Sequence, residues 1–254
     1  AAVVAALLLM MRDNAINAGE RLAGAFAQLT EQQTAPVIAS AKQGLEETGE
    51  RLAAVTAAGT ANEDTIRAAF RNILKDRPYF KEIRVLDAQG RIVFDSEPGS
   101  ASRDLFGRPH FIRHRDRPDS GFEVGELFQS PSTGTSYIPA TLTLRRANGE
   151  FSGVIIGAIA PQYLEAAWSL DDQIPGLAIV LASEDGRLLM RVPYDARFNG
   201  TSYGGGPLVA QLRAGRDFGT QQIVRGSDRA PRLLAFRRLA GFPELVIVVG
   251  QPME

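Results

Sequence analysis

Apolar positions along the first part of the chain recur at steps of three and four residues. The pattern runs from Asn14 to about Ala58 and predicts one very long helix with a single apolar stripe. Pro36 lies inside it and is expected to kink the helix, because proline has no N–H to donate. The helix exceeds the usual globular length, so part of the stripe is expected to contact the same helix of a second copy. The alternative is that the stripe packs only on its own domain. The stripe comprises Leu22, Phe26, Leu29, Gln33, Val37, Ala41, Leu45, Thr48, Leu52 and Val55.

An uninterrupted apolar run, Ala1 to Met11, precedes this helix. It is shorter than the roughly 20 apolar residues that span a bilayer, and it lacks the charged start of a signal peptide. Three interpretations are open: a buried helix, the core of a signal peptide, or the end of a transmembrane helix. We favour the end of a membrane anchor, because Arg12, Asp13 and Asn14 end the run abruptly and a polar helix continues without a break.

Beyond a second predicted helix, the pattern changes from the period of helices to that of strands. This helix covers Glu63 to Leu74 and follows Asn62, a residue suited to an N-cap. Ile83–Leu86 and Arg91–Phe94 then read as two strands joined by a tight turn. A polar stretch follows, with a short helix expected from Pro109. Further strands are expected at Glu123–Phe128, Ser136–Arg145 and Phe151–Ala160, the last two joined at Asn148-Gly149.

The second half of the chain repeats these hairpins. Gly90-Arg91 recurs 96 positions later as Gly186-Arg187, and Arg145-Arg146 recurs 92 positions later as Arg237-Arg238. Two landmarks at nearly one offset predict two copies of one αβ unit. We therefore expect an α+β protein in which each unit has a central antiparallel sheet. The expected parts are residues 1–58 with the anchor and the long helix, residues 59–165 with the first unit, and residues 166–254 with the second.

Composition and charge narrow the range of partners. The formal net charge is −1, and no cluster of basic residues suggests a nucleic-acid partner. The chain has no cysteine, so its fold uses neither disulfides nor thiolate metal sites. No phosphate loop, dinucleotide fingerprint or zinc-finger spacing is present, and we expect no cofactor.

Four stretches carry a recognisable order and spacing: Arg108–Phe111, Phe128–Gly134, Asn148–Val154 and Asp185–Pro193. Together they resemble the double Cache family of bacterial extracytoplasmic sensor domains, which are built from two PAS-like domains. The likeness covers the chain from Asn14 onward. The last stretch, Asp185–Pro193, resembles the histidine-kinase and cyclase branch in particular.

The resemblance implies a long helix that emerges from the membrane, then a membrane-distal and a membrane-proximal PAS-like domain. It implies a periplasmic location, with the membrane reached through flanking transmembrane helices, and no enzymatic activity in this chain. A two-component sensor histidine kinase is the favoured whole protein, ahead of a diguanylate cyclase and a chemoreceptor. A module that only dimerises or binds another protein is the competing class.

The family places its ligand in the distal domain, and here its amino-acid motif is altered. Amino-acid-binding members carry Arg-x-Trp-Tyr, whose arginine holds the ligand carboxylate. This chain keeps Arg108 but has His110 and Phe111 in place of the two aromatic residues. The Tyr-x-Asp motif that holds the ammonium is replaced by Phe128 and Ser130.

A later aspartate of the family maps onto Ala158, so both ammonium-binding carboxylates are missing. A buried ammonium without a carboxylate is poorly compensated, which disfavours an α-amino acid as ligand. We expect a small organic acid held by Arg108. The alternative is that Arg108 pairs with Asp104 or Asp116. The further expected donors are His110, His114, Ser130 and Tyr137.

Two other motifs, a pair of histidines and a match to the nucleophile elbow, lack the further residues that their chemistry needs. His110 and His114 are the only histidines and lie four residues apart, but no further ligand pattern supports a metal site. Gly200 to Gly204 match the nucleophile elbow G-x-S-x-G. That motif needs a preceding hydrophobic strand and a later histidine, and this chain has no histidine after His114.

Overall fold

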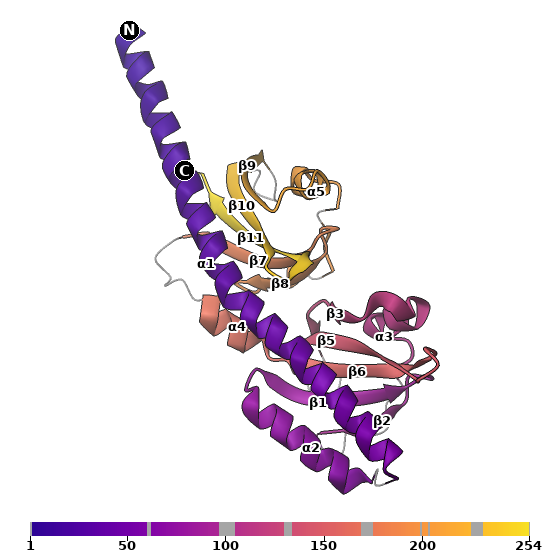
Figure 1. The fold of residues 1–254 in the computed structure, drawn as a ribbon. Coiled ribbons are helices and arrows are strands. Elements are labelled where there is room, and N and C mark those ends of the chain that lie inside the picture. Colours follow the sequence, from indigo (N-terminus) through magenta and orange to yellow (C-terminus); the bar gives the residue numbers. More distant parts are fainter. Residues whose placement is uncertain are drawn as a thin grey trace. The chain divides into compact units, whose positions relative to one another are not determined.

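The computed structural model begins with one long helix, followed by two antiparallel sheets with short helices (Figure 1). The α+β class and the order of a long helix and two tandem PAS-like sheets are therefore confirmed. The structure describes residues 2–59, 62–96, 105–129, 134–168, 175–198, 200–202, 204–224 and 231–253. The chain divides into two compact units, Pro36–Leu164, and Ala1–Ala35 together with Glu165–Glu254. We call them the β1–β6 unit and the β7–β11 unit.

Helix α1 (Ala2–Ala57) continues through Pro36 and contributes to both units. Its buried face includes Ala41, Leu45 and Thr48 of the predicted stripe, but nearer the N-terminus it is offset from that stripe. Leu22 and Leu29 are 43% and 45% exposed, whereas small residues beside them are buried. Small side chains let the helix backbone approach a neighbouring element closely, and the leucines are left toward solvent. The buried positions include Ala23, Ala27, Thr30, Thr34, Ile38, Ala41, Leu45 and Thr48.

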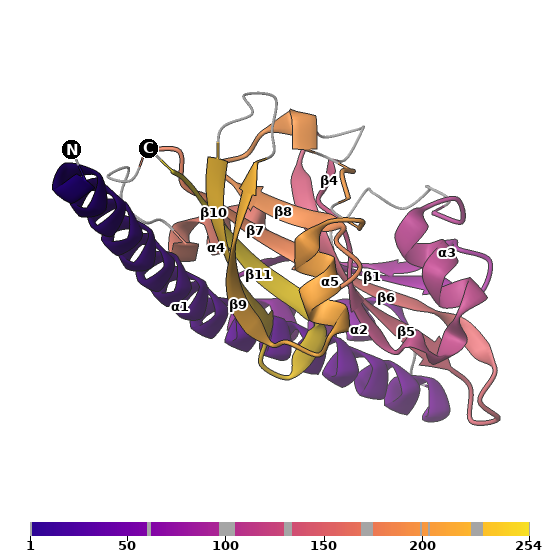
Figure 2. The ribbon, with the colours of Figure 1, turned by 90° about the horizontal axis from the view of Figure 1, so that it is seen from above.

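The sheet of the β1–β6 unit has the strand order β2-β1-β6-β5-β3, with β4 also paired to β5. Helix α2 (Glu63–Asp76) lies against β1 and β2, and its N-cap Asn62 accepts a hydrogen bond of 2.9 Å from the Thr65 N–H. Helix α3 (Pro109–Asp116) lies against β5 and β6 (Figure 2). The strands are β1 (Phe80–Asp87), β2 (Ile92–Asp95), β3 (Phe122–Val124), β4 (Phe128–Gln129), β5 (Ser136–Arg145) and β6 (Phe151–Ile159).

The sheet of the β7–β11 unit has the order β8-β7-β11-β10-β9, which is the same topology. In both units the first two strands form a hairpin, and the last strand lies between the first strand and the one before the last. Helix α5 (Pro207–Arg213) packs on this sheet through Leu208 and Leu212. The strands are β7 (Ala178–Ser183), β8 (Leu188–Val192), β9 (Phe218–Val224), β10 (Pro231–Leu239) and β11 (Phe242–Pro252).

The repeated glycines have the same structural reason in both units. Gly90 and Gly186 lie in the hairpin turns with φ of 78° and 90°, a region that disfavours side chains. Gly149 and Gly241 lie in the turns between the last two strands, with φ of 85° and 79°. The spacing that predicted two copies of one unit thus reflects two pairs of matching turns.

Specific polar contacts fix α1 to each unit. In the β7–β11 unit, the indole N–H of Trp168, at the end of α4 (Pro161–Trp168), donates to Thr34 over 2.8 Å. In the β1–β6 unit, Arg77 donates to the Ser40 carbonyl over 3.2 Å and forms a 2.9 Å ion pair with Glu47. Gly44 makes this second contact possible, because a Cβ there would lie 2.7 Å from Arg77 Nε.

Substitution of Gly44 by alanine should therefore destabilise the protein although alanine is the better helix former. The methyl group displaces the buried Arg77 side chain from its two partners, and we expect a loss of about 1–3 kcal/mol. Gly24→Ala, in the same helix with no atom within 4 Å of the new Cβ, should instead stabilise by roughly 0.5–1 kcal/mol. Urea unfolding of both variants measures the difference, and equal shifts of one sign would contradict the described docking.

Candidate functional site

Four of the predicted binding residues come together in the β1–β6 unit. The guanidinium carbon of Arg108 lies 4.9 Å from the centre of the Phe128 ring. The Phe128 ring lies 5.2 Å from the ring of Tyr137 and 6.3 Å from that of His110, edge to face in the second case. Arg108, His110, Phe128 and Tyr137 thus form one cluster around Phe128, which we call the Arg108 cluster.

Local sequence positions these side chains. Pro109 begins α3, so Arg108 is the N-cap residue with extended backbone, and its side chain makes no capping bond. Phe128 and Tyr137 are register partners in the β4–β5 pair, and partners across antiparallel strands project to the same face. The turn into α3 and the β4–β5 ladder therefore place a cation over an aromatic face.

Arg108 forms no ion pair with any residue in the described part of the chain. Asp116, one of the two partners considered from the sequence, instead bonds to Arg115 at 2.8 Å. Asp104, the other, lies outside the described residues. A guanidinium that is held on an aromatic ring, without an ion pair to any described residue, is suited to a planar anion.

His110 is 4% exposed, and within the described structure its Nε2 has no hydrogen-bond partner. Burial lowers the pKa of His110 to about 4, and the nearby charges of Arg113 and Arg108 act in the same direction. The imidazole is therefore neutral near pH 7. A buried nitrogen without a partner is unfavourable, so a ligand group that bonds to it gains free energy.

Tyr137 is 6% exposed, and burial raises its pKa to about 12, so its hydroxyl stays protonated. The charges of Arg84 and Glu82 on β1 also act on it. Sequence reasoning missed these two residues, which form a 2.8 Å ion pair, while Arg84 also contacts Asp95 over 2.9 Å. Charged residues at alternate positions of an otherwise apolar strand were the available signal.

The other predicted residues have different surroundings. Phe111 is fully buried in an apolar cluster with Leu86, Leu105, Val154 and Ile156. Both ring nitrogens of His114 lie 2.7 Å from a threonine hydroxyl, Nδ1 from Thr143 and Nε2 from Thr141. Ser130 lies outside the described residues.

The structure also describes the surroundings of the histidine pair and of the nucleophile-elbow match. No group of three or more histidine, aspartate or glutamate side chains among the described residues is placed to hold a metal ion. In the nucleophile-elbow match, the Ser202 hydroxyl accepts a 3.1 Å hydrogen bond from the Gly204 N–H, and Ser202 pairs with Arg187 in an isolated β-bridge.

Comparison with known proteins identifies the fold through solved structures. The extracellular domain of the presumed histidine kinase rpHK1S-Z16 matches with a TM-score of 0.68 and 22% identity, over 91% of this chain and 96% of that one. The ligand-binding domain of the Pseudomonas aeruginosa chemoreceptor PctB, in complex with L-Arg, gives 0.67 and 17% over 92% and 87%. That of the Pseudomonas fluorescens chemoreceptor CtaA, in complex with L-alanine, gives 0.63 and 18% over 95% and 97%. No family model and no curated protein matches the chain.

The chain therefore has the fold of the extracellular ligand-binding domains of histidine kinases and chemoreceptors, and the resemblance to double Cache domains is confirmed at the level of the fold. In the part of the chain that the structure describes, no helix combines the length and the apolar character that a membrane crossing requires.

The buried histidines make a pH-dependent prediction. Their pKa values are about 4 in the folded chain and about 6.5 when unfolded, so between these pH values the unfolded chain binds more protons. The contribution of the two histidines to the free energy of unfolding should be fully present above pH 6.5. It should fall from pH 6.5 toward pH 4, with a slope of up to about 1.4 kcal/mol per pH unit for each histidine. His110→Gln should show a shallower slope in urea unfolding. An imidazole NMR titration with a midpoint near 6.5 would contradict the buried state.

Proposed function

We propose that this chain is the extracytoplasmic ligand-sensing region of a transmembrane receptor, with a sensor histidine kinase as the favoured whole protein. The observation that carries the proposal is the Arg108 cluster, in which an arginine that forms no ion pair with the described residues lies beside the unpartnered Nε2 of His110 and the protonated hydroxyl of Tyr137. The fold, shared with domains solved in complex with small molecules, supports it. Catalysis would belong to parts outside this chain.

The ligand we propose is a small organic carboxylate rather than an amino acid. Arg108 would bind the carboxylate through two parallel N–H donors, and the Tyr137 hydroxyl would donate a further hydrogen bond. The motif positions that hold an ammonium group in the family carry Phe128, Ser130 and Ala158 here, so neither carboxylate is present. Glu82, the carboxylate that acts on Tyr137, is already paired with Arg84.

The competing ligand class is an amino acid, because the complexes of the structural neighbours hold L-Arg, L-alanine and, in the Pseudomonas aeruginosa chemoreceptor PctC, GABA. Binding of that kind here would need Glu82 to leave Arg84 or to serve both groups. The choice between the classes therefore depends on Arg108 and Glu82, which can be varied separately.

Replacement of Arg108 by alanine should weaken the binding of small carboxylates such as acetate, lactate and succinate to the chain. Loss of a desolvated charge-assisted pair weakens binding by about 1.5–3 kcal/mol, or roughly ten- to hundredfold. Arg115→Ala is the matched control, since Arg115 also lies on a phenylalanine, 4.8 Å from the Phe106 ring centre, and should bind like the wild type.

Isothermal titration calorimetry with the two arginine variants and Glu82→Gln measures this directly. Equal affinities for Arg108→Ala and the wild type would remove Arg108 from the site. If the chain binds amino acids more tightly than their deaminated analogues, and Glu82→Gln removes this preference, the ligand is a zwitterion and not a simple carboxylate.

The proposal includes a homodimer formed through α1 and an anchor in the membrane through flanking helices. Leu22, Phe26 and Leu29 lie at spacings of four and three, and the two leucines are nearly half exposed. Such a row is suited to the same row of a second copy. Between Val3 and Met11, six exposed apolar side chains would be covered by lipid or by a partner helix. They are Val3, Val4, Leu7, Leu9, Met10 and Met11.

Charge introduced into this row should dissociate the dimer. Leu22→Glu combined with Leu29→Glu places like charges opposite each other, so sedimentation equilibrium should give the mass of one chain where the wild type gives two. Gln28→Glu, an exposed position on the same helix, is the control for added charge alone and should remain dimeric. A monomeric wild type at high concentration would refute this interface.

A further inference from the structure

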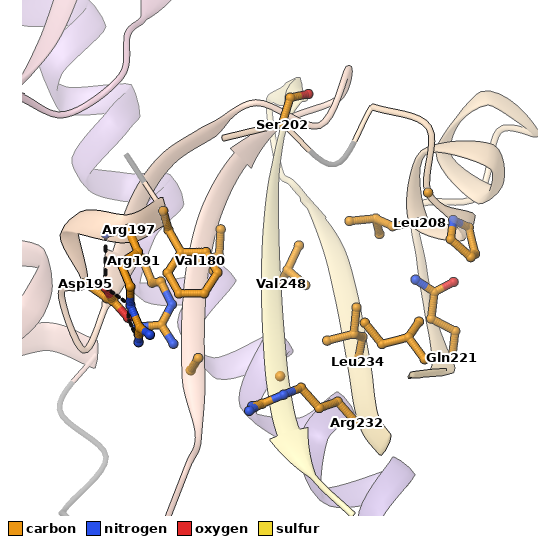
Figure 3. Close-up of a pocket in the computed structure, with 16 residues that line it drawn as sticks. Val180, Arg191, Asp195, Arg197, Ser202, Leu208, Gln221, Arg232, Leu234 and Val248 are labelled. Atoms are coloured by element: carbon orange, nitrogen blue, oxygen red, sulfur yellow. Dashed lines mark hydrogen bonds and ion pairs between the residues drawn. The ribbon is translucent and has the colours of Figure 1, made fainter. Parts of the chain in front are cut away.

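A hollow lies in the β7–β11 unit, on the face of the sheet beneath α5 (Figure 3). It has a volume of about 420 Å³, within the range of small-molecule sites. Residues from all five strands, the start of α5 and the short helix Ala196–Phe198 line it. It shares no residue with the Arg108 cluster.

Strand register explains why the sheet is hollow at this point. Ala178, Gly250, Leu234 and Gln221 are successive partners across β7, β11, β10 and β9, so they form one row on the same face. Strand β7 contributes only the methyl group of Ala178 to this row, and β11 contributes only the hydrogen of Gly250. The row beside it carries Val180 and Val248, which belong to the apolar cluster under α5. The floor of the hollow is therefore apolar and formed by small residues.

Arginines gather at one side of this apolar floor. Arg191 is the β8 partner of Val180, and its guanidinium carbon lies 4.7 Å from the centre of the Phe198 ring. Arg232 on β10 and the exposed Arg197 also line the hollow. Asp195 is the one carboxylate among the lining residues, and Arg197 binds it at 2.6 Å. Figure 3 shows the charged ends of the arginines to the left of Leu208 and Leu234.

We propose that this hollow is a second ligand site, which takes a monocarboxylate with an unbranched apolar tail. The carboxylate is bound by Arg191 and Arg232, and the tail lies on Ala178 and Gly250 under α5. Three arginines and one carboxylate line the hollow, a composition that favours an anionic ligand over a cationic one. Its single carboxylate is engaged by Arg197, which leaves a zwitterion's ammonium without a partner.

The ligand class differs from that of the Arg108 cluster because the floor differs. The Arg108 cluster presents aromatic and polar groups, whereas the hollow presents valine, leucine and alanine side chains at van der Waals distance from a tail. Each methylene transferred from water to such a surface tightens binding about fourfold. The dependence of affinity on the alkyl chain length of the acid therefore distinguishes the hollow from the Arg108 cluster.

The test is calorimetric titration of the whole chain with acetate, butanoate, hexanoate and octanoate, with 1-octanol as a probe without charge. The wild type should bind each longer acid about sixteenfold more tightly per two methylenes, and octanoate more tightly than octanol. Ala178→Leu fills the floor of the hollow and should abolish the dependence of the affinity on the chain length of the acid. Arg191→Gln with Arg232→Gln should weaken octanoate at least tenfold and leave octanol unchanged.

The controls keep the two proposals separate. Arg216→Gln changes an exposed arginine outside the hollow and should bind octanoate like the wild type. Arg108→Ala should also keep octanoate binding, so failure at one site is visible without failure at the other. Gly250→Ala, whose Cβ would lie 3.1 Å from Leu234 Cδ2, is a milder filling variant, and circular dichroism checks that each variant is folded. Affinity independent of length, or undiminished octanoate binding in the Ala178 and Gly250 variants, overturns the proposal.

Discussion

The arrangement of each sheet depends on its last strand, which pairs on both sides at the centre. Strand β6 lies between β1 and β5, and β11 lies between β7 and β10, with the central positions of both strands buried. Each unit is therefore completed only when the end of its sequence returns to its beginning. The candidate sites lie beside the short helices on each sheet face, the Arg108 cluster at the start of α3 and the hollow of the β7–β11 unit under α5.

The same topology carries two different chemical surfaces. In the β1–β6 unit, the turn into α3 brings Arg108 over Phe128, beside the buried groups of His110 and Tyr137. In the β7–β11 unit, Ala178 and Gly250 leave the sheet face open beneath α5. The two proposed sites therefore differ in the ligand that each would take, a small polar acid at the Arg108 cluster and an acid with an apolar tail in the hollow. Ligand binding at either site can shift a conformational equilibrium only by its differential affinity for the two states.

The elements were predictable where the sequence pattern has a local cause. The helix after Asn62, the strand Ser136–Arg145 and the glycine turns all follow from capping, alternation and positive φ. The buried face of α1 was predicted wrongly in part, because the small residues beside Leu22 and Leu29 make the closer contact. Contacts between residues that strand register brings together from distant parts of the chain could not be predicted from the sequence. The row of Ala178 and Gly250 leaves no signal in neighbouring positions of the chain, and Arg84 near Tyr137 left only the alternation of charged residues along an otherwise apolar strand.

The central claim is that Arg108 is available to an external carboxylate rather than engaged within the chain. A crystal structure with bromoacetate tests it most directly, because bromine gives an anomalous signal at the position of the bound acid. The account predicts an anomalous peak beside the Arg108 guanidinium and Tyr137 hydroxyl, which is absent from crystals of Arg108→Ala grown in the same way. An Arg108 side chain paired to an aspartate of its own chain, with no peak beside it, would contradict the account.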